Sequence, residues 1–443
     1  MTTSPLDGAA TTRSGRTTGG RACGCPEFRM SRRRLLGTAM ATGGALAGAQ
    51  MFGDAFRQVA YGGEPGGNVV VVLSLRGGSD GLSLVVPRNV DSARDHDHLT
   101  GYRSTIVVPQ GALLDLGAER RFGLHPALDP LLPMWQAGSF GAVHAVGLPA
   151  PNRSHFDAME EVEDADPGSR LRVGWINRVI GFDGANAPEE AVALGTSLLP
   201  TSMVGPSSAL GVNQVGDLQI AGVGTSGEAR RQSLSQMWRA SGTPLARGVK
   251  VAVDSTTKLA RLAENVDDDV HGDLYPDGPL RGALANTAAL IREDVGTKMI
   301  AIDYGDWDMH EGLGSVDGGW MTDHLGHFAA SLKVFFDDLG SHAGRVTVVT
   351  ISEFGRRVEE NGSGGVDHGY GNAMLLLGAG VAGGAVRGDW PGLAPGDLVD
   401  GDLAMRQDFR DVLWEVLDSR LPGVQRDAIF PGFRPTALGT MRA

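Results

Sequence analysis

The sequence predicts an α/β fold with a largely parallel central sheet. Five continuous apolar runs, rich in Val, Leu and Ile, are typical of strands that are buried on both faces. Stretches with helical periodicity separate most of these runs, and such an alternation indicates parallel strands joined by helical crossovers. Hydrophobic residues make up 42% of the chain, which is enough to form a large core.

The expected elements can be placed in order along the chain. Strands are predicted at residues 68–75, 140–146, 299–303, 346–351 and 373–377. Helices are predicted at residues 126–137, 155–164, 171–182, 228–240, 280–295, 320–339 and 408–417. We expect a single domain over residues 68–435, and the segment from about 185 to 275, which has the weakest pattern, is interpreted as an insertion.

The first 49 residues have the layout of a twin-arginine export signal. Residues 31–36 read Ser-Arg-Arg-Arg-Leu-Leu, an apolar run rich in Ala and Gly follows, and residues 47–49 (Ala-Gly-Ala) offer a cleavage site. The run is too short for a stable transmembrane segment, which takes about 20 apolar residues. The alternative is a basic tail before a first helix. We expect the twin-arginine export machinery as a partner, an extracytoplasmic location (periplasm, cell wall or secreted), and a linker at residues 50–67.

Charge and cysteine content narrow the function further. The chain has a formal net charge of −13, and because residues 1–49 carry +5, the remainder carries −18. A surface this acidic argues against nucleic acid as a partner. Both cysteines, Cys23 and Cys25, precede the twin arginines. Any metal site in the rest of the chain must therefore be built from His, Asp, Glu and Ser.

Polar clusters follow four of the predicted strands. In open parallel sheets, ligands bind outside the carboxyl ends of the strands. We therefore expect the functional site at this edge. The residues concerned are Asp80; Arg153, Ser154 and His155; Asp308 and His310; Arg356; and Asp367 and His368.

Two carboxylate–imidazole pairs indicate a divalent metal. Asp367 and His368 are adjacent, and Asp308 and His310 are two apart on an extended segment, so that both project to the same side. Oxygen and nitrogen donors suit zinc, manganese or iron, and oxygen donors also suit calcium. For each pair the alternative is an exposed loop that binds nothing.

Ser154 lies where a helix is predicted to begin, with an acidic residue three positions later. That spacing is typical of an N-cap. A helix N-terminus also favours anions, so that capping and a role as a nucleophile are compatible. His125 and His144 are interpreted as core histidines.

Taken in order, these motifs resemble the family known as domain of unknown function 1501, which is twin-arginine-exported and belongs to the alkaline-phosphatase-like, sulfatase-like superfamily. The resemblance implies a three-layer sandwich around the parallel sheet. It covers residues 68–433, and the matching stretches are residues 75–82, 152–158, 307–310, 352–356 and 367–369.

The superfamily's two-metal plan implies a role for each candidate residue and hydrolysis of a small phosphate or sulfate ester. Ser154 would be the nucleophile, and Arg153 or Arg356 would bind the anion, with His155 beside them. The implied metal ligands are Asp80, Asp308, His310, Asp367 and His368.

The chain departs from the superfamily pattern in one respect, because no histidine follows His368. Asn372, or one of His125, His144 and His155, could supply the missing ligand; otherwise the second metal site is weak or absent. The departure also favours an alternative function. In that alternative, the chain is a catalytically degraded exported protein that binds or assembles with another exported protein.

Overall fold

The computed structural model describes residues 66–169, 172–182, 186–215 and 272–442, and also residues 227–241, 243, 246, 249–250 and 253–255. The expected export signal and nearly all of the expected linker, residues 1–65, lie outside the described residues. None of the helices in the described ranges is both long and apolar enough to cross a bilayer.

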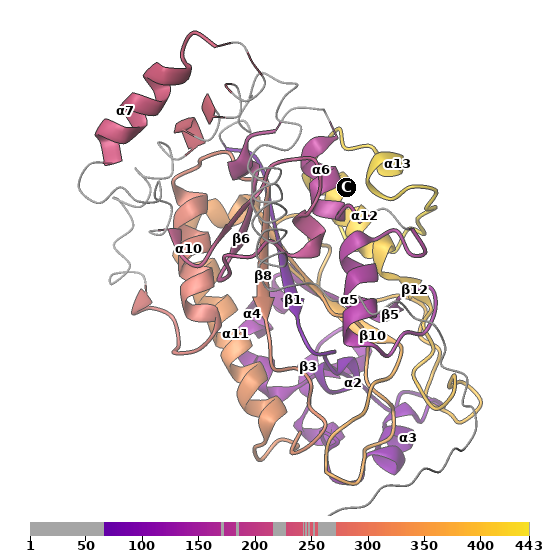
Figure 1. The fold of residues 1–443 in the computed structure, drawn as a ribbon. Helices are drawn as coiled ribbons and strands as arrows, with labels where there is room; N and C mark the ends of the chain where they lie inside the picture. Colours follow the sequence, from indigo (N-terminus) through magenta and orange to yellow (C-terminus); the bar gives the residue numbers. More distant parts are fainter. Residues whose placement is uncertain are drawn as a thin grey trace, which may run out of the picture. The chain divides into compact units, whose positions relative to one another are not determined.

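A central sheet of largely parallel strands organises the described domain (Figure 1). β1 (Val69–Leu75) pairs in parallel with β8 (Met299–Tyr304) on one side and with β9 (Val346–Ile351) on the other. β10 (Asn372–Gly378) is antiparallel to both of its neighbours, β9 and β5. The strand order is β11-β5-β10-β9-β1-β8-β6-β7, with β12 also beside β5. The remaining strands are β5 (Phe140–Gly147), β6 (Ala191–Leu194), β7 (Leu210–Val212), β11 (Val386–Arg387) and β12 (Gln407–Asp408).

Helices cover both faces of this sheet, as Figure 1 shows. Successive side chains of β1 point to opposite faces, so Val71 packs in one core cluster and Val70 in the other. The first cluster includes α10 (Leu280–Arg292) and α11 (Trp320–Leu339). The second includes α5 (His155–Asp164), α6 (Trp175–Gly181), α12 (Phe409–Arg420) and α13 (Arg426–Ile429). The predicted three-layer α/β sandwich with a largely parallel sheet is confirmed.

The helices begin where the sequence provides start signals. Ser154 caps α5 by accepting the N–H of Asp157 at 3.4 Å, and Asp408 caps α12. The helix expected at 126–137 is instead a 3-10 segment, η3 (Pro126–Leu131), followed by α4 (Leu132–Gln136). The reason is that prolines at positions 130 and 133 lack the N–H that a continuous helix needs. The other helical segments are α2 (Gly81–Leu84), α3 (Asp95–Tyr102), α7 (Gly227–Trp238), η2 (Gln110–Ala112), η4 (Pro188–Glu190), η5 (Thr201–Met203) and η8 (Gly340–Arg345).

Several short strands lie in segments that have no strand pattern in the sequence. β2 (Val85–Pro87), β4 (Glu119–Leu124) and β3 (Leu114–Leu116) form a separate antiparallel sheet. β6 and β7 fall inside the segment expected as an insertion, yet they extend the central sheet beyond β8. These two strands of that segment therefore continue the sheet.

Candidate metal centre

Loops that follow β1, β5, β8 and β9 meet at the carboxyl edge of the sheet, as the sequence predicted. Contacts join the loops in pairs: Arg356 binds Asp308, His310 binds Asp367, and His155 faces Glu353. The three imidazoles of His155, His310 and His368 converge on one oxygen, Asp308 Oδ1. We refer to these four residues as the metal group.

His155 is the first residue of α5, so the Ser154 cap fixes the position of its backbone. Its Nδ1 lies 3.3 Å from Glu353 Oε1, and its Nε2 lies 3.5 Å from Asp308 Oδ1. The Nε2 atom is buried and has no hydrogen-bond partner. Only the Nδ1 contact has hydrogen-bond geometry, which favours a ring with its hydrogen on Nδ1 and the Nε2 lone pair toward Asp308.

The ring of His368 is oriented like that of His155, with Nδ1 toward an acceptor and Nε2 toward Asp308. Its Nδ1 donates to the backbone carbonyl of Arg153 at 2.9 Å, and its Nε2 lies 3.4 Å from Asp308 Oδ1. Burial lowers the pKa of His368 below its ordinary value, and the nearby Arg356 charge adds to this effect, which favours the neutral ring.

His310 completes the group from the half-exposed side. Its Nδ1 lies 3.0 Å from Asp367 Oδ1, and its Nε2 lies 3.0 Å from Asp308 Oδ1 and 2.9 Å from His368 Nε2. A hydrogen bond from Asn361, followed by one from His310, keeps the pKa of Asp367 below its ordinary value, so Asp367 is an acceptor. Both nitrogens of His310 thus face carboxylate oxygens, and its Nε2 also faces Nε2 of His368, so that a proton on His310 or a metal ion would satisfy the close approach of the two Nε2 atoms.

The donor set fits a divalent metal ion. His155, Asp308 and His368 each offer one atom, and these atoms all lie within 4.8 Å of one another. Contacts of 2.9 to 3.5 Å connect the group with His310 included. Ligands about 2.0–2.1 Å from a tetrahedral ion lie roughly 3.3 Å apart. Each Nδ1 is bound to an acceptor, as is usual for the ring nitrogen of a metal-bound imidazole that does not contact the metal.

Arg356 holds Asp308 in place from the buried side. Its side chain is fully buried, and its Nη2 donates to Asp308 Oδ1 at 2.7 Å. Burial raises the pKa of Asp308, but the hydrogen bond and charge of Arg356 outweigh burial and leave that pKa below its ordinary value. The guanidinium also donates to the carbonyls of Gly77, Gly78, Trp307 and Val366. These contacts make Arg356, which the sequence suggested as an anion contact, a support for Asp308.

Asp80 is not brought into the group. It is 2% exposed, and its Oδ2 and Oδ1 accept from the Arg103 guanidinium at 2.5 and 3.0 Å, with Ser83 Oγ 2.5 Å from Oδ2. Burial raises the pKa of Asp80, but the charge and hydrogen bonds of Arg103 outweigh it and lower the pKa overall. Both oxygens are thus already engaged by a cation.

Ser154 and Arg153 lie at the start of α5, next to His155. Ser154 is half-buried, and its hydroxyl caps the helix. The Arg153 guanidinium is 43% exposed and pairs with the buried Asp402. The carbonyl of Arg153 orients His368, so this short segment supports two of the imidazoles.

Of the residues considered for the missing ligand, His155 alone lies in the group. His144 lies in the core, where its ring contacts the Val85 carbonyl at 3.0 Å through Nε2. His125 accepts the Ala127 N–H and caps η3. Asn372 is buried and binds the backbone N–H of Gly81 and the carbonyl of Phe354.

Sequence reasoning gave no role to Glu353 or Arg103. Glu353 is 4% exposed and contacts His155, and Arg103 neutralises Asp80. A signal for Glu353 was present, because an acidic residue directly after a buried strand lies at the same edge as the other candidates. Arg103 comes from a polar segment whose sequence carries no such signal.

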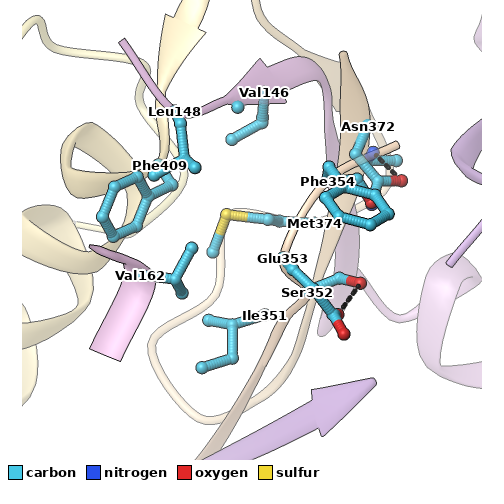
Figure 2. Close-up of a pocket in the computed structure, with 12 residues that line it drawn as sticks. Val146, Leu148, Val162, Ile351, Ser352, Glu353, Phe354, Asn372, Met374 and Phe409 are labelled. Atoms are coloured by element: carbon cyan, nitrogen blue, oxygen red, sulfur yellow. Dashed lines mark hydrogen bonds between the residues drawn. The ribbon is translucent and has the colours of Figure 1, made fainter. Parts of the chain in front are cut away.

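An apolar pocket adjoins the group, and Figure 2 shows its lining. Phe354 contributes to the pocket and also packs against His155 and His368, with ring centroids 4.9 and 4.7 Å apart. Glu353 and Phe354 thus line the pocket and contact the metal group. The apolar side chains that line it are Val146, Leu148, Val162, Ile351, Met374 and Phe409.

Comparisons with known proteins give a family and distant structural neighbours. The family described as "Protein of unknown function (DUF1501)" matches residues 130–407. No curated protein matches the chain. The C-terminal periplasmic domain of EptC from Escherichia coli, in complex with zinc, is 9% identical, with 85% of this chain and 89% of that chain covered and a TM-score of 0.33. An alkaline phosphatase superfamily protein from Vibrio parahaemolyticus is 11% identical, with 76% and 69% covered and a TM-score of 0.32.

Proposed function

The chain belongs to the DUF1501 family of proteins of unknown function, and we propose that it is a metal-dependent hydrolase of a phosphate or sulfate ester. One observation carries the proposal. The Nε2 atoms of three histidines face Asp308 Oδ1, while each Nδ1 is held by an acceptor. This arrangement suits a divalent cation, with His155, Asp308 and His368 as ligands and His310 beside them.

The exposure of the group supports a catalytic rather than a buried structural ion. Asp308 and His310 are 46% and 41% exposed, whereas the His155 and His368 side chains are 29% and 22% exposed. A substrate oxygen can therefore reach the ion from the side of Asp308 and His310. The N-terminus of the ten-residue helix α5 lies at His155, and its N–H groups favour an anion there.

The residues around the group have distinct proposed roles. A bound divalent ion would polarise an ester oxygen and lower the pKa of a coordinated hydroxyl. Ser154 is the proposed nucleophile, because its hydroxyl lies at the start of α5, one residue from His155. Arg153 is the proposed anion contact, because its half-exposed guanidinium has donors beyond the one that binds Asp402. Arg356 supports Asp308.

The proposed place of action is extracytoplasmic. The support is the sequence of residues 31–49, in which a triple arginine precedes a mild apolar run and small residues. Export by the twin-arginine route carries folded proteins, so an ion would be loaded before the chain crosses the membrane.

Elemental analysis combined with an ester screen tests the proposal. The protein, purified without chelator, should hold about one zinc, manganese, iron or calcium ion per chain and should hydrolyse an aryl phosphate or aryl sulfate. Asp308→Ala and His368→Ala should each lose the ion and the activity, whereas His327→Ala, at an exposed histidine of α11, should keep both. Ser154→Ala should keep the ion and lose turnover by roughly 10³-fold, as expected for a nucleophile. A wild-type protein that binds no metal after reconstitution would overturn the proposal.

The ion pair between Asp80 and Arg103 favours a second candidate function. Because this pair engages both oxygens of the predicted first-strand ligand, the two-metal plan that the resemblance implied has one ligand fewer. A protein that binds metal but does not turn over esters would act by binding or assembly with another exported protein. Metal occupancy without turnover of any phosphate or sulfate ester in the screen would select this function.

A further inference from the structure

Glu353 is a buried carboxylate to which the proposed reaction assigns no step. Its side chain is 4% exposed, and both oxygens accept backbone N–H groups, with Gly77 N at 2.7 Å from Oε1 and Gly78 N at 3.0 Å from Oε2. Ser352 Oγ lies 3.2 Å from Oε2. Each of these neighbours acts as a donor, so Glu353 sits in the structure as a fixed acceptor.

The remaining contact of Glu353 is with His155. Both ring nitrogens face a carboxylate oxygen, but only the 3.3 Å contact between Nδ1 and Glu353 has hydrogen-bond geometry, and this favours the ring hydrogen on Nδ1 and the lone pair on Nε2. The buried Nε2 has no hydrogen-bond partner and faces Asp308 Oδ1. In the Nε2–H tautomer, the ring would direct a hydrogen at Asp308 Oδ1, and the protonated Nε2 could not bind a metal.

We propose that Glu353 is a positioning residue that holds His155 in the Nδ1–H tautomer and so makes it a metal ligand. The metal-binding part of this inference rests on the proposed function. The tautomer itself is a property of the chain without metal, so the two can be tested separately.

Glu353 also takes part in a common support for two ligands. The N–H groups of Gly77 and Gly78 bind Glu353, and their carbonyls bind the guanidinium of Arg356, which holds Asp308. Gly77 has φ +114°, and a Cβ there would lie 2.6 Å from the backbone nitrogen of Asp308. One dipeptide therefore fixes both the carboxylate that orients His155 and the arginine that orients Asp308.

Glu353→Gln keeps the size of the side chain but removes its charge and one of its two acceptor oxygens. The glutamine amide has one oxygen for the three donors around it, and its NH₂ group must face either His155 Nδ1 or a glycine N–H. An NH₂ facing His155 stabilises the Nε2–H tautomer. Loss of such a second-shell partner typically costs 10- to 100-fold in metal affinity.

The experiment is histidine-selective ¹⁵N labelling of the metal-free protein, with long-range ¹H–¹⁵N spectra that distinguish the tautomers and His155→Gln to assign the signal. Wild type should show Nδ1–H at His155, and Glu353→Gln should shift it toward Nε2–H. The zinc Kd, measured by competition with a chelator, should rise 10- to 100-fold in Glu353→Gln.

Glu163→Gln is the matched control. Glu163 is a similarly buried carboxylate on α5 that accepts the Thr201 N–H at 3.1 Å and pairs with Arg76. Its replacement should leave the His155 tautomer and the zinc Kd unchanged.

The outcomes distinguish this inference from the proposed function. An Nε2–H tautomer in the wild type overturns the inference, whether or not any variant folds. A Glu353→Gln protein with unchanged tautomer and Kd also overturns it, while zinc binding by the wild type leaves the proposed function standing. A wild type that shows the Nδ1–H tautomer but binds none of zinc, manganese, iron and calcium supports the effect of Glu353 on the tautomer and overturns the proposed function.

Discussion

Asp80 and Asp308 follow two neighbouring parallel strands, β1 and β8, and each is bound by a buried arginine, yet their surroundings differ. Asp80 is 2% exposed and gives both oxygens to Arg103, with Ser83 as a further donor. Asp308 is 46% exposed, and its Oδ1 faces three imidazole nitrogens as well as Arg356.

The difference shows that position at the carboxyl edge does not make an aspartate a metal ligand. At Asp80 the positive charge and the acceptors are matched within the protein, since the other donors of Arg103 bind the carbonyls of Arg357 and Val358. At Asp308 three imidazole Nε2 atoms face one carboxylate oxygen that has a single arginine donor, an arrangement that suits an additional cation. The first region is a structural ion pair, and the second is the proposed metal site.

The largest effect that this comparison predicts is on stability at Asp80. Arg103→Met should lower the free energy of unfolding by about 3–5 kcal/mol, because it leaves the Asp80 carboxylate buried without its partner. Urea denaturation of the metal-free protein at pH 7 measures the loss. The double variant Asp80→Asn/Arg103→Met should recover part of it, since the uncompensated charge is removed.

Arg281→Met is the control for loss of an arginine. Arg281 pairs with Asp273 and Asp277, whose side chains are 81% and 93% exposed. Such a surface pair contributes at most about 1 kcal/mol. If Arg103→Met cost no more than Arg281→Met, Asp80 would not depend on its ion pair, and its distinction from Asp308 would fail.

The histidines extend the comparison between a buried and a half-exposed region. We expect the core histidines, His125 and His144, to stay neutral in the folded protein at a pH where they are protonated in the unfolded chain. Burial lowers the pKa of His125 and His144 to about 4. In the unfolded chain both titrate near 6.5, so the unfolded state binds more protons between pH 6.5 and 4, and stability falls as the pH falls through that range. Each should contribute a loss of up to ~2 kcal/mol between pH 7 and pH 5.

His125→Asn tests this pH dependence. Asparagine can still cap η3, as the His125 ring does, but it does not titrate. Urea denaturation at pH 7 and at pH 5 should show a smaller difference for His125→Asn than for the wild type. His327→Asn, at an exposed histidine, should leave the difference unchanged. An unchanged difference in His125→Asn would mean that His125 is not held neutral by burial.

The sequence was sufficient to predict the central strands, because strands buried on both faces read as continuous apolar runs. Residues 346–351 were predicted as the strand that β9 forms. β6 and β7 were not predicted, because strands of three or four residues are too short to show a recognisable hydrophobic pattern. The expectation that ligands lie at the carboxyl edge of the sheet also predicted that Asp308, His310 and His368 would meet. His155 was among the residues predicted at the same edge.

The roles of the acidic residues could not be predicted in the same way. The burial of Asp80 depends on Arg103, which lies 23 residues away in sequence and is itself fixed by carbonyls near position 357. Glu353 is recognised only from the direction of a hydrogen bond to His155. Both depend on tertiary contacts that a strand-end motif does not encode.

Asp367 gives the smallest of these effects and separates two roles for the same carboxylate. The sequence suggested a metal ligand, whereas in the structure Asp367 Oδ1 binds Nδ1 of His310 and Nδ2 of Asn361. As a support for His310, exposed at 55%, it can be replaced in part by water, so Asp367→Ala should weaken zinc binding about tenfold, at the low end for second-shell partners. Asp317→Ala, at an exposed residue before α11, should have no effect. Complete loss of the ion in Asp367→Ala, equal to that in Asp308→Ala, would make Asp367 a direct ligand and move the site toward the two-metal plan. A tenfold change would keep the ion on Asp308 and the histidines, where three Nε2 atoms face a carboxylate that remains 46% exposed beside its arginine.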